Sequence, residues 1–60
     1  NQQEAGILFS EDYGGLKPEE MARCLAKRIQ SAHIPKMVVT MGSDGAAYAD
    51  QEGTGAFIQL

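Results

Sequence analysis

The stretch Pro18–Ala32 constrains the fold most, because it carries the clearest helical pattern in the chain. Proline at the first helical position loses no internal hydrogen bond, and the two glutamates that follow it favour the positive first turn of a helix. Met21, Leu25 and Ile29 recur at a spacing of four and form one apolar stripe. We therefore predict an amphipathic helix that buries this stripe against another element.

The segment after this helix is predicted to be a strand. Pro35 disfavours a helical conformation at Ile34, so the helix should end near Ala32 or His33. The run Met37–Met41 is continuously apolar and β-branched, a pattern typical of a strand that is covered on both faces in a parallel sheet. A helix that leads into a buried strand indicates an α/β fold.

Weaker signals complete the prediction of two helices and about three strands. They are a short helix over Gln2–Phe9, a strand over Ala46–Ala49, a turn over Asp50–Gly53 and a third strand over Ala56–Leu60. Gly6 weakens the first helix by about 1 kcal/mol relative to alanine, so this helix needs packing to persist.

Length and charge narrow the function classes. A chain of 60 residues makes one domain at most, and its net charge of −3, with acidic and basic residues mixed, argues against a nucleic-acid surface. No apolar run reaches the roughly 18 residues of a membrane span, and one unpaired cysteine fits a reducing compartment, so we expect a cytoplasmic protein without membrane contact. Neither Asn1 nor Leu60 looks like a natural terminus, and we expect a piece of a longer chain.

Two features of the long helix have simple explanations. Arg23, Lys27 and Arg28 are interpreted as a solvated face, with a regulatory anion site as the second interpretation. Cys24 lies beside the apolar stripe and is interpreted as a small packed residue rather than a reactive thiol.

The first four residues, Asn1-x-x-Glu4, have two interpretations. As a capping box, the Asn1 side chain accepts from the amide of Glu4, and the Glu4 carboxylate reaches back to the nitrogen of Asn1. As a ligand site, the amide and carboxylate on one helical turn hold the water shell of a magnesium ion, which commonly uses only one or two protein carboxylates. The local pattern favours the cap.

The stretch Thr40–Gly45, with the sequence TMGSDG, has two compatible interpretations as well. Asp44-Gly45 is a common signal for the turn of a β-hairpin. Glycines directly after a strand also let backbone amides approach a phosphate, and the hydroxyl of Thr40 or Ser43 adds a donor. Spacing alone favours the hairpin.

The order of these motifs resembles the ribokinase-like (PfkB) family of carbohydrate kinases. In that family Asn-x-x-Glu precedes a helix and a strand that ends in Thr-Leu-Gly-x-x-Gly, followed by small residues and an aromatic. Here the strand reads Val38-Val39-Thr40-Met41-Gly42-Ser43-Asp44-Gly45, with Met41 in place of leucine and Tyr48 as the aromatic. The resemblance implies that residues 1–60 are one partial domain, the nucleotide-side segment of a three-layer α/β/α sandwich.

The resemblance also implies site residues and partners. Thr40 and Gly42 would line the phosphates of ATP, and Gly45 would let the chain turn beside the nucleotide. Asn1 would lie near the transferred phosphate, and Glu4 would organise Mg²⁺ through water. The parent chain would transfer the γ-phosphate of ATP to a hydroxyl of a sugar or similar alcohol, with a homodimer left open.

The catalytic part of the family pattern is missing from this stretch. The Gly-Ala-Gly-Asp motif, which carries the family's catalytic aspartate, does not occur, and Gly53-Thr54-Gly55-Ala56 has no aspartate after it. We assign no catalytic residue and expect the 60 residues alone to be inactive. The alternative hypotheses are a stand-alone α+β binding or interaction module, and a module that binds nucleotide without phosphate transfer.

Overall fold

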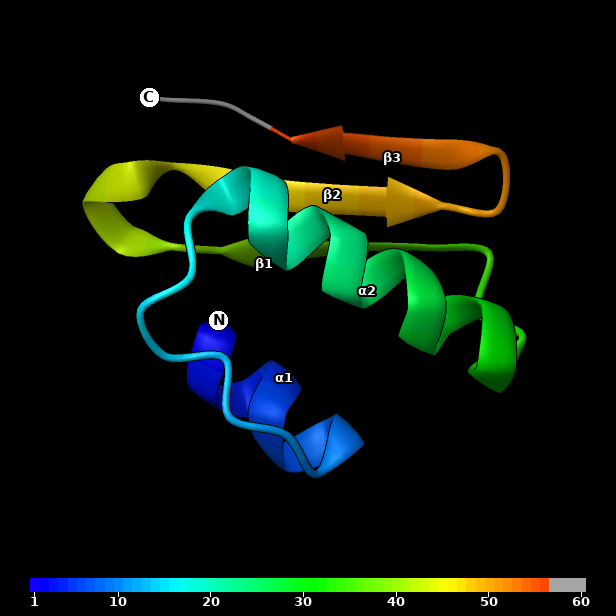
Figure 1. Ribbon diagram of the computed structural model, residues 1–60, viewed down its shortest axis with the longest axis horizontal. Coiled ribbons are helices and arrows are strands. Elements are labelled where there is room, and N and C mark those ends of the chain that lie inside the picture. The colour runs from blue at the N-terminus through cyan, green and yellow to red at the C-terminus, as the bar shows by residue number, and fades with distance from the viewer. Residues whose placement is uncertain (57–60) are drawn as a thin grey trace.

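The computed structural model describes residues 1–56 and places them in two helices and a three-stranded sheet. The elements in order are α1 (Gln2–Phe9), α2 (Pro18–Ala32), β1 (Lys36–Thr40), a 3₁₀ turn η1 (Gly42–Asp44), β2 (Ala46–Asp50) and β3 (Gly53–Ala56). The sheet is antiparallel with the order β1-β2-β3. Helix α2 lies across the sheet, and α1 lies beyond β1, on the side away from β2 (Figure 1).

The core lies between α2 and one face of the sheet. Met21, Leu25 and Ile29 are fully buried, as the stripe at a spacing of four predicts. They pack in one cluster with Val39 of β1 and Ala47 of β2, which are register partners. Because side chains alternate along a strand, every second residue of β1 and β2 faces away from this core.

Two expectations for β1 are wrong within the described residues. The strand pairs antiparallel with β2 rather than in a parallel sheet, because the short loop after Thr40 returns the chain directly as a hairpin. It is also not covered on both faces: Val39 is 1% exposed, whereas Val38 is 60% exposed. A continuous apolar run shows which residues favour a strand, but it does not show what covers each face.

The other expectations for the elements are mostly confirmed. Helix α1 spans the predicted residues, α2 ends at Ala32, and β2 begins at Ala46 as predicted. The third strand begins earlier than expected, at Gly53, and the remainder of the predicted strand, residues 57–60, lies outside the described residues. The small α/β arrangement of two helices and three strands is confirmed for residues 1–56.

Helix α1 contributes Ala5 and the partly buried Phe9 to the hydrophobic core. Ala5 is its buried residue, whereas Ile7 is 75% exposed. Ser10 adopts a left-handed conformation, and its amide and that of Glu11 both donate to the carbonyl of Gly6, which ends the helix. Within residues 1–56 no helix has the length and apolar character that crossing a bilayer requires.

Candidate functional site

The Asn1-x-x-Glu4 motif forms the predicted capping box. The Asn1 side-chain Oδ1 accepts from the Glu4 amide at 2.9 Å, and the nitrogen of Asn1 donates to Glu4 Oε1 at 2.7 Å. In the 60-residue chain the amino group of Asn1 also lowers the pKa of the Glu4 carboxyl below its ordinary value of 4.5, through this hydrogen bond and its positive charge. Both side chains remain mostly exposed, at 60% and 78%, so the cap leaves the motif accessible from solvent.

The loop between β1 and β2 is a tight hairpin connection, as its spacing favours. The amide of Asp44 donates to the Met41 carbonyl at 3.1 Å, and the amide of Gly45 donates to the Gly42 carbonyl at 3.1 Å. The Gly45 carbonyl accepts from the Met41 amide at 2.7 Å, which closes the loop. These bonds use the amides of Asp44 and Gly45 within the turn, so a phosphate would have to approach the loop from its Thr40–Ser43 side.

Both glycines of this loop adopt backbone conformations that favour glycine. Gly42 has φ 58° and Gly45 has φ 93° with ψ −122°. A side chain at Gly45 would strain the backbone, because L-residues rarely occupy that region. The prediction that Gly45 permits a close turn is therefore consistent with its geometry, while its contact with a nucleotide stays a prediction.

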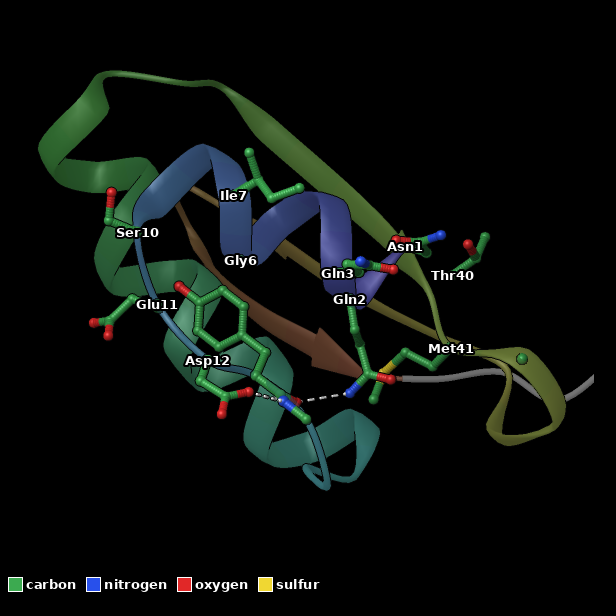
Figure 2. A pocket seen from close by; sticks show the side chains of 13 residues that line it. Asn1, Gln2, Gln3, Gly6, Ile7, Ser10, Glu11, Asp12, Thr40 and Met41 are labelled. Atoms are coloured by element: carbon green, nitrogen blue, oxygen red, sulfur yellow. Dashed lines mark hydrogen bonds between the residues drawn. The ribbon is translucent and has the colours of Figure 1, made fainter.

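A groove with a volume of about 820 Å³ brings part of the predicted site together. Asn1 at the start of α1, Thr40 at the end of β1 and Gly42 of η1 all line it, although Asn1 and Thr40 lie far apart in the sequence. Figure 2 shows Asn1 and Thr40 at one end of the groove, with Ser10 and Glu11 at the other. Glu4 and Gly45 do not line the groove.

The second wall of the groove comes from the loop after α1, which the sequence motifs did not indicate. Gln2 Nε2 donates to the carbonyl of Tyr13 at 3.0 Å and to the carbonyl of Leu16 at 3.4 Å, and this side chain ties the loop to the first turn of α1. The carboxylate of Asp12 accepts from the Gly14 amide at 3.0 Å. The Gly14-Gly15 pair is typical of a loop, but no local signal pairs that loop with Gln2.

Gly6 allows the loop to approach α1 closely. A Cβ at this position would lie 2.5 Å from the carbonyl oxygen of Glu11, well inside van der Waals contact. The glycine that weakens the helix is therefore the residue that makes room for the groove wall.

The charge of the groove limits what it can hold. Among the described residues that line it, Glu11 and Asp12 carry negative charge and none is lysine or arginine. A polyphosphate in the groove would need a bound cation to neutralise its charge. The described residues contain no group of three or more His, Cys, Asp or Glu side chains placed to hold a metal ion. Mg²⁺ bound chiefly by phosphate oxygens and water, with a single carboxylate nearby, is compatible with these residues.

Comparisons with protein-family models, curated proteins and solved structures found no match to this chain.

Proposed function

We propose that this chain is the nucleotide-side segment of an ATP-dependent carbohydrate kinase of the ribokinase-like type. In the whole enzyme it would belong to a three-layer α/β/α sandwich that transfers the γ-phosphate of ATP to a sugar hydroxyl. The observation that supports the proposal most is that Asn1, Thr40 and Gly42 all line the groove, with Asn1 and Thr40 at one end of it (Figure 2). These are residues of the two motifs on which the resemblance depends, and they come from separate elements.

In this proposal the chain positions phosphate and leaves the chemistry to residues elsewhere. The Thr40 hydroxyl and the backbone at Gly42 would donate to phosphate oxygens, and the Asn1 side chain would lie beside the transferred group. Glu4, held at the same helix start by the capping box, would orient Mg²⁺ through water. Phosphoryl transfer depends mainly on such positioning and on charge neutralisation, so a segment of this kind contributes without a catalytic base.

Titration of the ¹⁵N-labelled chain with magnesium-ATP tests this proposal. We expect saturable shifts at the amides of Gly42 and Ser43 and at the side-chain amide of Asn1, with weaker binding when Mg²⁺ is omitted. Thr40→Val should weaken binding about tenfold, the effect of one hydrogen bond to a charged group. Thr54→Val is the matched control, because Thr54 is exposed on β3 and lies outside the groove. Equal effects of the two variants, or no shift in the β1–β2 loop, would remove the support for a nucleotide site.

The mass and sequence of the native polypeptide test the kinase part separately. We expect a parent chain in the size range of a larger α/β domain, with Gly-Ala-Gly-Asp within a few tens of residues after Leu60. A parent chain without that motif would exclude an active kinase of this type.

The alternative, a small α+β binding or interaction module, is favoured by one specific observation. The capping box pairs Asn1 with Glu4, and the β1–β2 loop uses the amides of Asp44 and Gly45 in its own hydrogen bonds, so both motifs have a structural explanation without a ligand. A cooperative melt of the monomeric chain together with no response to magnesium-ATP would favour this module.

A further inference from the structure

A second cavity, of about 340 Å³, lies between α2 and the loop that follows α1. Four residues of α2 line it, namely Cys24, Lys27, Arg28 and Ser31. Residues three and four positions apart share one face of a helix, so these four form a single face of α2. The lining residues are Glu11, Tyr13, Cys24, Lys27, Arg28 and Ser31. Apart from Glu11 and Tyr13, none of them lines the larger groove.

The Tyr13 hydroxyl is the unusual group in this cavity. Tyr13 is 5% exposed, and its hydroxyl is buried without a hydrogen-bond partner. Buried tyrosine hydroxyls normally have a partner, so an unpaired one indicates a place where a further group can bind. Burial raises the pKa of Tyr13, so the hydroxyl stays protonated and can donate to an acceptor.

Two cationic side chains line this cavity, and one of them, Arg28, lies close enough to the Tyr13 hydroxyl to oppose the rise of its pKa. Arg28 is half-buried and forms an ion pair with the carboxylate of Glu11, and Lys27 forms no ion pair within residues 1–56. The two cations outnumber the one carboxylate, although the chain as a whole is negative. The Arg28 guanidinium already donates to the Glu11 carboxylate, so it is accessible to an oxyanion at this place.

We propose that this cavity binds a small tetrahedral oxyanion, such as inorganic phosphate or sulfate, between Lys27, Arg28 and the Tyr13 hydroxyl. The anion takes the place of the Glu11 carboxylate at the guanidinium, where it forms charge-assisted hydrogen bonds. Glu11 then acts as the competing internal anion and sets the affinity of the site. The proposal uses neither Asn1 nor Thr40 and is independent of the proposed nucleotide site.

The test is a titration of the ¹⁵N-labelled 60-residue chain with inorganic phosphate at constant ionic strength, without nucleotide or Mg²⁺. We expect saturable shifts at the amides of residues 11–13 and 27–31, similar shifts with sulfate, and none with chloride. Tyr13→Phe should weaken binding about tenfold, because one donor to a charged ligand is lost. Glu11→Gln should tighten binding several-fold, because the competing carboxylate is removed.

A charge-matched pair separates a site from general screening. Lys27→Ala and Arg23→Ala each remove one positive charge from α2, but only Lys27 lines the cavity. Of these two variants, we expect Lys27→Ala to weaken phosphate binding and Arg23→Ala to leave it unchanged. Equal effects of this pair, no saturation with phosphate, or weaker binding by Glu11→Gln would each overturn the proposal. If Tyr13→Phe fails to fold, the comparison of Lys27→Ala with Arg23→Ala still tests the anion site. Failure of magnesium-ATP to bind the larger groove would not count against the anion site, because the two titrations are separate.

Discussion

The two helices of this protein are held in place by different kinds of contact. Helix α2 buries Met21, Leu25 and Ile29 completely, so its attachment is the hydrophobic burial of one stripe. Helix α1 buries Ala5 and part of Phe9 in the core but exposes Ile7 and Leu8, and the side chain of Gln2 ties it to the loop that follows it. The buried apolar stripe therefore accounts for the position of α2, whereas α1, the helix beside the candidate site, combines a smaller apolar contact with hydrogen bonds to the neighbouring loop.

The largest expected difference between the two helices is in the loss of unfolding free energy when one leucine of each is replaced by alanine. Leu25→Ala should lower the free energy of unfolding by about 2–5 kcal/mol, because Leu25 is fully buried and its loss leaves a cavity. Leu8→Ala should change it by less than about 0.5 kcal/mol, because Leu8 is 60% exposed. Urea denaturation of both variants measures the difference, and similar losses would show that α1 is also held by hydrophobic burial.

Gly6→Ala tests the glycine contact of α1. Alanine raises helix propensity by about 1 kcal/mol. The added Cβ meets the Glu11 carbonyl at 2.5 Å, and relief of that overlap should cost about 1–3 kcal/mol, so we expect net destabilisation and a displaced groove wall. Gly53→Ala is the control, because a Cβ there has no neighbour within 4 Å. A more stable Gly6→Ala variant would contradict the proposed role of this glycine.

Substitutions at the N-cap residues of the two helices should change the stability of the protein in opposite directions. Asn1→Ala removes a side chain that caps α1 and should cost about 1 kcal/mol. Lys17, at the start of α2, makes no side-chain capping bond, so Lys17→Asn should stabilise the protein by about 0.5–1 kcal/mol. Thermal unfolding of both variants measures the effects, and destabilisation by Lys17→Asn would show that its exposed 3.7 Å pair with Asp44 matters more than the cap.

The smallest expected effect is the pH dependence of the stability of α1. In the folded 60-residue chain the amino group of Asn1 lowers the pKa of Glu4, so ionised Glu4 contributes stability to that chain above its ordinary pKa of 4.5. That contribution is lost as the pH falls through the lowered folded value. Amide shifts of the first turn of α1, followed by NMR below pH 5, should report this loss. Glu4→Gln should abolish the dependence, and an unchanged titration in that variant would assign it to another group.

The motif residues illustrate how much of the candidate site the sequence could predict. Asn1 and Glu4 form the capping box that their spacing indicates, and the β1–β2 loop is the hairpin that Asp44-Gly45 indicates. Both depend on residues a few positions apart, where backbone geometry fixes the contact. The convergence of Asn1 and Thr40 was an implication of the family resemblance, and nothing in the local pattern of either motif specifies it.

Local sequence patterns are sufficient to predict the two helices, the hairpin turn and the face of α2 that is buried. Those features follow from periodicity, capping and turn chemistry within a few residues. The coverage of β1 on one face, the hold of Gln2 on the loop after α1 and the burial of the Tyr13 hydroxyl without a hydrogen-bond partner follow from tertiary packing. The physical reason is that burial and long-range hydrogen bonds depend on which elements pack together, and short-range sequence patterns do not encode that choice.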